Sequence, residues 1–154
     1  MKIRIRISRK HCSIIALLLL VSCNSSSNHS GKGSEPSSHV ESSEETKNKF
    51  ARGEEIYSAQ CAACHQPDGK GLAGTFPPLA DSDYLMTDKT RAIKQIINGS
   101  SGEMMVNGKI YNGIMPAPQL TDEEVQLVTY FIMNAWGNEG GEVSADDVKK
   151  AKAQ

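Results

Sequence analysis

The chain has 154 residues, of which 38% are hydrophobic and 23% charged, and a formal net charge of −1. Residues 1–22 hold five basic side chains and no acidic one, so the remainder of the chain carries a formal charge of −6. This acidic balance argues against nucleic acid as a partner, because a protein that binds phosphates needs clustered Lys and Arg.

Residues 1–22 have the pattern of an export signal, in which a basic segment precedes an apolar run from Ile14 to Val21. The run is too short to cross a bilayer, which needs about 20 apolar residues in a helix. It ends in Leu-Val-Ser-Cys at 20–23, which resembles the box of bacterial lipoproteins, where the cysteine becomes the lipidated N-terminus. We therefore predict a lipoprotein signal peptide, a lipid on Cys23, and export to a bacterial membrane that faces the periplasm or the cell exterior. The alternative is an ordinary signal peptide that ends near a cysteine.

The next segment, residues 23–48, is rich in Ser, Asn, Glu and Lys and has no aromatic side chain. Such a composition buries too little apolar surface to offset the entropy of ordering, so we predict a disordered tether. All eight aromatic side chains of the chain lie between Phe50 and Trp136. This places one globular domain at residues 49–138.

Within this domain the hydrophobic periodicity is mainly helical. Residues 48–63 carry Phe50 and Tyr57 at helical spacing, and residues 90–98 place three isoleucines on one side. Between these two segments, residues 66–78 are rich in Gly and Pro, which predicts a loop.

A turn signal follows the second predicted helix. The Asn107-Gly108 pair is typical of a two-residue hairpin turn, because both residue types tolerate positive φ. Residues 104–111 around it are compatible with a small hairpin and with a bare loop, so both remain open.

The last helix of the domain has the clearest start signal, a capping box formed by Thr121 and Glu124. Residues 139–154 after it are predicted to form a polar tail. Ser144 in this tail is a candidate cap for a short final helix.

Residues 61–65 form the pattern Cys-Ala-Ala-Cys-His, which is the attachment sequence for a c-type haem. The thiols of Cys61 and Cys64 add to the two vinyl groups of the haem, and His65 ligates the iron. A zinc site needs four ligands, but the other two cysteines lie in the first 23 residues. A thioredoxin-like dithiol needs a βαβ setting, and no segment reads as a parallel sheet. We therefore expect one covalently bound haem c.

The opposite face of the iron needs a second ligand, for which the domain offers several methionines: Met86, Met104, Met105, Met115 and Met133. Met115 lies within residues 112–118, a segment with two prolines that we expect to be irregular and to hold one side chain in a fixed position. We predict Met115 as the ligand. Met104 and Met105 remain alternatives, whereas Met133 on an apolar helix face reads as core packing.

From residue 50 to residue 138 the chain resembles the class I cytochromes c, in several features that occur in the same order. Gly53 resembles the glycine at which the first helix crosses the last, and Met115 resembles the axial methionine. Phe-Pro-Pro-Leu at 76–79 resembles the loop whose proline carbonyl accepts a hydrogen bond from the ligand histidine, a role that falls on Pro77. The resemblance implies an all-α fold around one covalent haem, with room for a small hairpin at 104–111.

Three shorter motifs resemble the cytochrome domains fused to copper nitrite reductases and related dehydrogenases: Gly-Lys-Gly at 69–71, the turn at 107–108 and Trp-Gly-Asn at 136–138. The resemblance implies an electron carrier that is not itself an enzyme. Its iron is held by His65 and Met115, and it exchanges single electrons with reductase, oxidase or dehydrogenase partners.

Two other functions remain open at this point. One is a haem catalyst or gas sensor in which the methionine leaves the iron, and the other is the electron-entry subunit of a larger complex. His65 is the only histidine of the domain, which argues against peroxidase chemistry.

Overall fold

The computed structural model describes residues 38–154, and the side chains from residue 43 onward. These residues belong to a single unit, 35–154. The predicted signal peptide, Cys23 and the first part of the predicted tether lie outside the described residues. The elements are α1 (Ser38–Gln60), α2 (Ala62–His65), α3 (Asp83–Thr87), α4 (Lys89–Asn98), β1 (Ser100–Val106), β2 (Lys109–Met115), α5 (Asp122–Asn134) and α6 (Ala145–Lys152).

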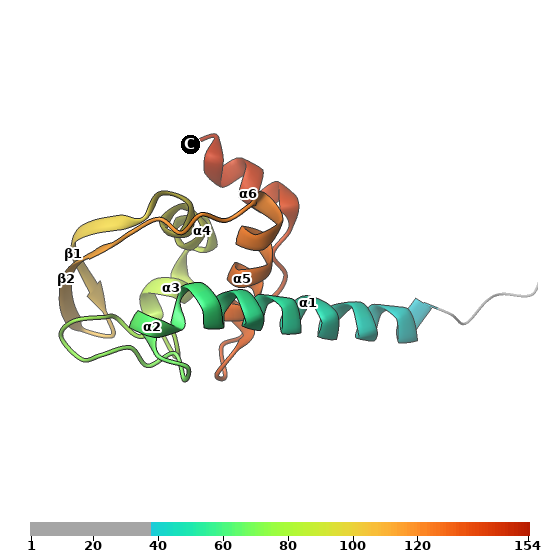
Figure 1. The fold of residues 1–154 in the computed structure, drawn as a ribbon, viewed down its shortest axis with the longest axis horizontal. Coiled ribbons are helices and arrows are strands. Elements are labelled where there is room, and N and C mark those ends of the chain that lie inside the picture. The colour runs from blue at the N-terminus through green and yellow to red at the C-terminus, as the bar shows by residue number, and fades with distance from the viewer. Residues whose placement is uncertain (1–37) are drawn as a thin grey trace, which may run out of the picture. The chain divides into compact units, whose positions relative to one another are not determined.

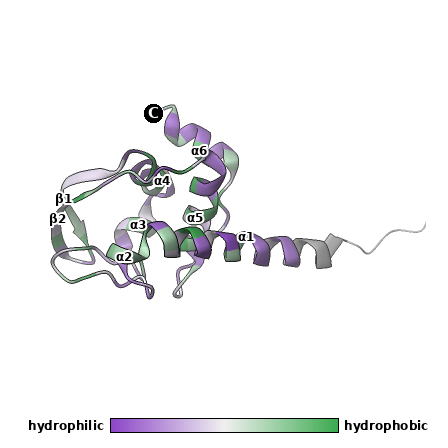
Figure 2. Cartoon of the chain, in the orientation of Figure 1, coloured by the Kyte–Doolittle hydropathy of each residue, from purple (hydrophilic) through white to green (hydrophobic). Residues whose placement is uncertain are grey.

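The fold is mostly helical, as the sequence predicts, and of the two alternatives left open around residues 104–111 the structure has the two-stranded antiparallel hairpin (Figure 1). α1 crosses α5 at Gly53, where a Cβ would lie 2.7 Å from the Cβ of Phe131 and closer still to the Leu127 carbonyl oxygen. The rings of Phe50 and Tyr57 pack against Phe131, with ring centroids 4.9 and 5.4 Å apart. Figure 2 shows that α5, at the centre of this packing, is mainly apolar.

The N-terminal part of α1 corrects the predicted tether. The helix begins at Ser38 and not near residue 48, so the prediction of disorder is wrong for residues 38–48. Residues 43–48 are exposed, and Glu44 and Lys47 form an ion pair of 3.1 Å across one turn. The prediction considered only how much apolar surface these residues could bury. Because the rest of α1 is already packed, the helix is nucleated, and extending it by further residues costs little free energy.

The hairpin is longer than the predicted residues 104–111, because its strands extend to residues 100 and 115. The predicted turn is confirmed: Asn107 and Gly108 have φ of 50° and 71°, as a two-residue turn of this type requires. Asn107 also exchanges two hydrogen bonds with Asp83, of 2.7 and 2.9 Å, which join the turn to the start of α3. Sequence analysis did not predict α3.

Met115 lies in regular structure, which corrects the expectation of an irregular segment. It is the last residue of β2 and pairs with Ser100. Pro116 follows it and ends the strand, since proline has no N–H to donate. Gly102 and Gly113 pair with one another in the middle of the hairpin. Because glycine is a weak strand former, the strand preferences of the residues do not predict the full length of these strands.

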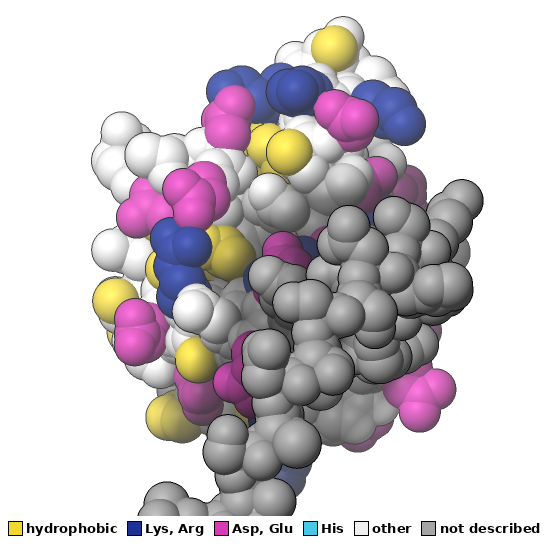
Figure 3. Space-filling view, turned by 90° about the vertical axis from the view of Figure 1, so that its right-hand side faces the viewer, with side chains coloured by type: hydrophobic (Ala, Val, Ile, Leu, Met, Phe, Trp, Pro, Cys, Tyr) yellow, Lys and Arg dark blue, Asp and Glu magenta, His cyan; other side chains and the backbone are white. Residues whose placement is uncertain are grey.

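Residues 139–154, predicted to be a polar tail with a candidate short helix, pack against the rest of the domain. Ser144 caps α6 as predicted, in a capping box with Asp147. Val143 and Val148 are fully buried against the core. Figure 3 shows acidic and basic side chains beside one another where α6 lies, and Lys89 of α4 pairs with Asp147 at 3.0 Å.

Of the helices in the described part of the chain, none combines the length and the apolar composition that crossing a bilayer requires.

Candidate haem site

The attachment motif follows α1 directly: Cys61 lies between α1 and α2, and the other four residues of the motif form α2 (Ala62–His65). The carbonyl of Cys61 accepts hydrogen bonds from the N–H groups of Cys64 and His65, at 3.2 and 3.0 Å. Both cysteines are free thiols; that of Cys61 is half-buried and that of Cys64 is exposed. Burial, and then the neighbouring Cys64, raises the pKa of the Cys61 thiol to about 11. The Cys61 thiol is thus protonated at neutral pH, and the two cysteines lie on one turn of the chain.

His65 is buried, with 9% of its surface exposed. Its Nδ1 lies 3.0 Å from the carbonyl oxygen of Pro77. A carbonyl can only accept, so Nδ1 carries the proton and Nε2 keeps its lone pair. Burial lowers the pKa of His65, and the hydrogen bond to Pro77 opposes this only in part. The ring is therefore neutral with one free nitrogen, which is the form that ligates metals.

The loop that presents Pro77 is held by contacts with α2 and with the segment that follows α5. The Gly71 N–H donates to the His65 carbonyl at 2.9 Å, and the Trp136 indole N–H donates to the Pro67 carbonyl at 3.2 Å. The hydrogen bond that the resemblance implies for Pro77 is thus present, and the surrounding loop holds its carbonyl in place.

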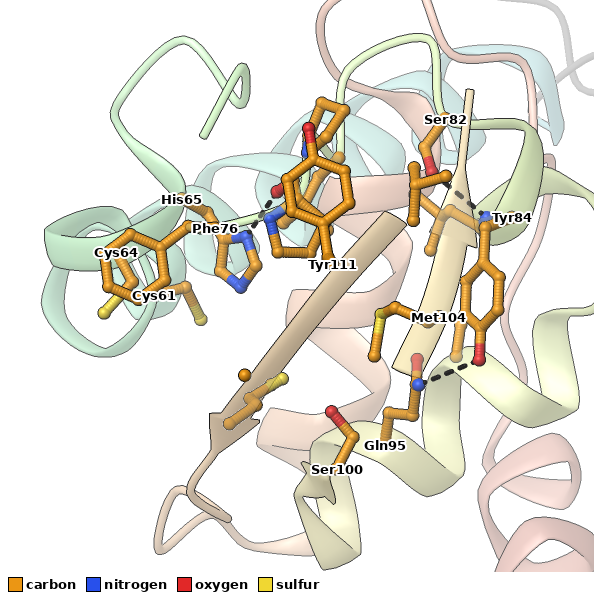
Figure 4. A pocket seen from close by; sticks show the side chains of 18 of the residues that line it. Cys61, Cys64, His65, Phe76, Ser82, Tyr84, Gln95, Ser100, Met104 and Tyr111 are labelled. Atoms are coloured by element: carbon orange, nitrogen blue, oxygen red, sulfur yellow. Dashed lines mark hydrogen bonds between the residues drawn. The ribbon is translucent and has the colours of Figure 1, made fainter. Parts of the chain in front are cut away.

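A cavity of about 290 Å³ opens beside the motif and brings the predicted site residues together. Cys61, Cys64, His65 and Pro77 line one side, and Met115 lines it from the end of β2. Figure 4 shows His65 pointing into this space from one side and Met104 from the hairpin.

The three methionines of the hairpin are not equivalent. Met104 and Met115 line the cavity, but Met105 is 61% exposed and is not among the lining residues. Strand alternation explains the difference, because Met105 lies on the face of β1 opposite to Met104. Met105 is therefore removed from the candidate ligands.

The inner face of the hairpin has a bare patch that sequence analysis missed. Gly113 lines the cavity between Tyr111 and Met115 on the same face of β2, and its partner Gly102 is on the matching face of β1. A Cβ at Gly113 would meet only the Thr75 carbonyl oxygen, at 3.7 Å, and a Cβ at Gly102 would meet nothing within 4 Å. This leaves room for a flat ring between the hairpin and His65.

The described residues do not support the other uses of a Cys-x-x-Cys motif. None of their His, Cys, Asp and Glu side chains gather in a group of three or more that could hold a metal ion. Their one sheet is an antiparallel pair, and a thioredoxin-like dithiol requires a βαβ unit. The paired thiols, neutral histidine and apolar cavity instead fit a covalent haem.

The sequence model of the cytochrome c family matches residues 50–136, which is more than half of the chain. This chain belongs to the cytochrome c family. It is a mostly helical cytochrome c with a small hairpin, it carries one covalent haem c, and it is an electron carrier.

The relatives include a cytochrome c-552 and subunits of a dehydrogenase and of an oxidase. Cytochrome c-552 of Thermus thermophilus is 40% identical over 114 residues, which cover 68% of this chain and 86% of the relative. The cytochrome c subunit of the quinone-type alcohol dehydrogenase of Gluconobacter oxydans is 33% identical, over 65% of this chain and 22% of the subunit. A cbb3-type cytochrome c oxidase subunit of Rubrivivax gelatinosus is 34% identical, over 67% and 31%.

These relatives test the predicted resemblance to the cytochrome domains of dehydrogenases and of copper nitrite reductases. The likeness to cytochrome domains of dehydrogenases is confirmed, but the chain spans less than a third of those longer proteins. The likeness to the domains fused to copper nitrite reductases stays a prediction.

Proposed function

We propose that this cytochrome c carries single electrons with its iron held by His65 and Met115. Haem c, when bound, supplies a one-electron couple, and His/Met ligation raises its potential. The observation that carries the proposal is that one cavity joins the attachment motif to Met115. His65 would bind through Nε2, since Pro77 occupies Nδ1.

Two features favour Met115 over Met104. Met115 packs against the buried core, whereas Met104 is not among the residues of that cluster. Its backbone is also wedged against Gly99, where a Cβ would collide with the Met115 carbonyl and lie 2.9 Å from the Ala117 nitrogen. A side chain held in this way can stay on the iron in both oxidation states without a change of ligand.

The test compares two variants, Met115→Ala and Met104→Ala. Ferric haem with a methionine ligand has a weak sulfur-to-iron charge-transfer band at the red end of its spectrum. Met115→Ala should abolish this band and lower the midpoint potential, while Met104→Ala should keep both. The reverse result would move the ligand to Met104 and leave the carrier function intact.

The partners in this proposal are redox proteins of the dehydrogenase, reductase or oxidase type. Support comes from relatives that are subunits of a dehydrogenase and of an oxidase. Residues 50–137 hold six basic and ten acidic side chains, so long-range attraction would favour a partner with a basic or neutral surface. Affinity capture from solubilised membranes would identify the partner, and electron-transfer rates that rise with salt would contradict the expected charge preference.

The proposal also keeps the carrier at a membrane through a lipid on Cys23. Support comes only from the sequence of residues 1–23, which lie outside the described residues. Labelled palmitate should enter the wild type and not Cys23→Ser. A wild type that stays wholly soluble and unlabelled would refute the anchor.

A further inference from the structure

The sequence has three Asn-Gly pairs, at 98–99, 107–108 and 112–113. In such a pair the asparagine side chain can react with its own backbone. The glycine nitrogen, once it has lost its proton, attacks the side-chain carbonyl carbon and ammonia leaves. Water then opens the resulting five-membered imide to aspartate or isoaspartate. Glycine favours the attack because it has no Cβ in the way, so the surroundings of each asparagine decide which pair reacts.

Asn107 is protected by hydrogen bonds to its carboxamide. Its Oδ1 accepts from the Asp83 N–H at 2.9 Å, and its Nδ2 donates to the Asp81 carbonyl at 3.0 Å. Both hydrogen bonds must break before the carboxamide carbon can turn towards the nitrogen of Gly108. Asn107 is therefore held unreactive although it is exposed.

Asn112 is protected by the strand in which it lies. It is exposed, but it pairs with Glu103, and the following Gly113 pairs with Gly102 in the middle of the hairpin. The ladder holds the backbone extended on both sides of Asn112, whereas the imide needs the glycine nitrogen to turn towards the side chain. The reaction at this pair therefore requires the hairpin to open.

Asn98 has neither kind of protection. It is the last residue of α4, where the chain leads into the hairpin (Figure 1), and its side chain is exposed. Within the part of the chain that the structure describes, its carboxamide has no hydrogen-bond partner, and the N–H of Gly99 has none either. Gly99 has φ of 72° and belongs to neither the helix nor the strand. Both reacting groups are therefore free at this pair.

We propose that Asn98 is a site of spontaneous modification, at which the asparagine is converted to aspartate or isoaspartate through an imide with Gly99. A bond forms between the Gly99 nitrogen and the Asn98 Cγ as the Cγ–Nδ2 bond breaks. Ammonia is released and water is consumed, so no oxidant, cofactor or enzyme is needed. Both products place a carboxylate at the end of α4, and isoaspartate also adds a carbon to the backbone between α4 and β1.

The longer backbone adjoins the segment that holds Met115. A Cβ at Gly99 would collide with the Met115 carbonyl oxygen and lie 2.9 Å from the Ala117 nitrogen. The next residue, Ser100, pairs with Met115. Because this contact is already too close for a side-chain carbon, isoaspartate at 98 displaces the end of β2 and with it Met115. This consequence rests on the proposed ligation of the iron by Met115, whereas the modification itself does not.

The first experiment incubates the full haem-loaded chain at mildly alkaline pH and measures conversion at each Asn-Gly pair by peptide mapping with mass spectrometry. Conversion at Asn98 should be at least about tenfold faster than at Asn107, because two hydrogen bonds must break to free Asn107. It should also exceed conversion at Asn112. Asn98→Gln keeps a carboxamide but forms the imide poorly, so conversion should then remain only at the other two pairs. Conversion at Asn98 no faster than at Asn107 and Asn112 would overturn the site.

The second measurement follows the sulfur-to-iron charge-transfer band in the same samples. The band should fall in step with isoaspartate at Asn98 and should persist in Asn98→Gln. Asn98→Asp adds the carboxylate without the extra backbone carbon and should keep the band, so its loss there would overturn the role of the longer backbone. Conversion at Asn98 with an unchanged band would overturn the effect on Met115 and leave the modification site standing. A wild type that lacks the band before incubation would instead contradict the proposed ligation.

Discussion

At the scale of single residues, Gly71 lets the loop backbone come close enough to place the Pro77 carbonyl beside His65. A Cβ there would collide with the carbonyl oxygen of Phe76 and lie 2.7 Å from that of Pro77, the acceptor for His65. The residue also has φ of 63°, in the left-handed region. Only a residue without a side chain satisfies both constraints, so the orientation of His65 depends on a glycine that is not among the residues lining the cavity.

We predict that Gly71→Ala lowers the free energy of unfolding more than Gly74→Ala does. Both sites have positive φ and both variants suffer that strain, but a Cβ at Gly74 would meet nothing within 4 Å. The collision should add about 1–3 kcal/mol at Gly71. Denaturant titration of the two haem-loaded variants gives the difference. Equal losses would mean that the loop moves aside without cost.

At the scale of the elements, the Asp147 carboxylate adds a polar contact to the apolar packing that attaches α6 to the domain. Hydrogen bonds from the Ser144 backbone and hydroxyl, and then the ion pair with Lys89, lower the pKa of Asp147 from 3.8 to about 2. A depressed carboxyl pKa adds stability above the unfolded value and loses it as pH falls through the folded value. This contribution is therefore present above about pH 4 and is lost towards pH 2.

Asp147→Asn should lower the free energy of unfolding at neutral pH by about 1 kcal/mol, a figure reduced for solvent screening. It should also flatten the decline in stability between about pH 4 and pH 2. Asp146→Asn is the control, because Asp146 is exposed on the same helix and pairs only with Lys149 in the next turn. Similar pH profiles for the two variants would remove Asp147 from the attachment of α6.

The hairpin supplies a prediction about haem binding. Gly113→Leu would fill the bare inner face, which the protein alone leaves open, and should sharply lower the yield of covalent haem. Glu103→Leu adds the same side chain to an exposed position of β1 and should load normally. Haem-stained denaturing gels compare the two. Full loading of Gly113→Leu would show that the ring lies elsewhere.

The same elements show what a sequence can and cannot predict here. The motif at 61–65, the Asn107-Gly108 turn and the Ser144 cap depend on local chemistry, so they were predictable. The full length of the hairpin was not predictable, because Gly102 pairs with Gly113 in its middle and glycine is a weak strand former. These glycines leave the inner face of the hairpin open for the haem. Tyr84 and Gln95, which also line the cavity, belong to no local motif, and only the fold brings them together there.

At the scale of the whole molecule, the cavity lies where the attachment turn, the loop with Pro77, the hairpin and α5 meet. A small domain has little apolar surface to bury. In this one, side chains that would otherwise pack against one another line the cavity instead. The haem therefore completes the core as well as carrying the electron. This double use explains why Met115, which packs against the core, also lines the cavity.

The central claim is that the iron is held on both faces by His65 and a methionine and changes only its charge. A spectroelectrochemical titration of the full haem-loaded chain, followed by exposure of the reduced form to carbon monoxide, tests it most directly. We expect one reversible one-electron step, with a slope of about 59 mV per tenfold change in the ratio of oxidised to reduced protein, and no rapid binding of carbon monoxide. Rapid binding to the wild type would mean an open iron, and the protein would then be a haem catalyst or gas sensor.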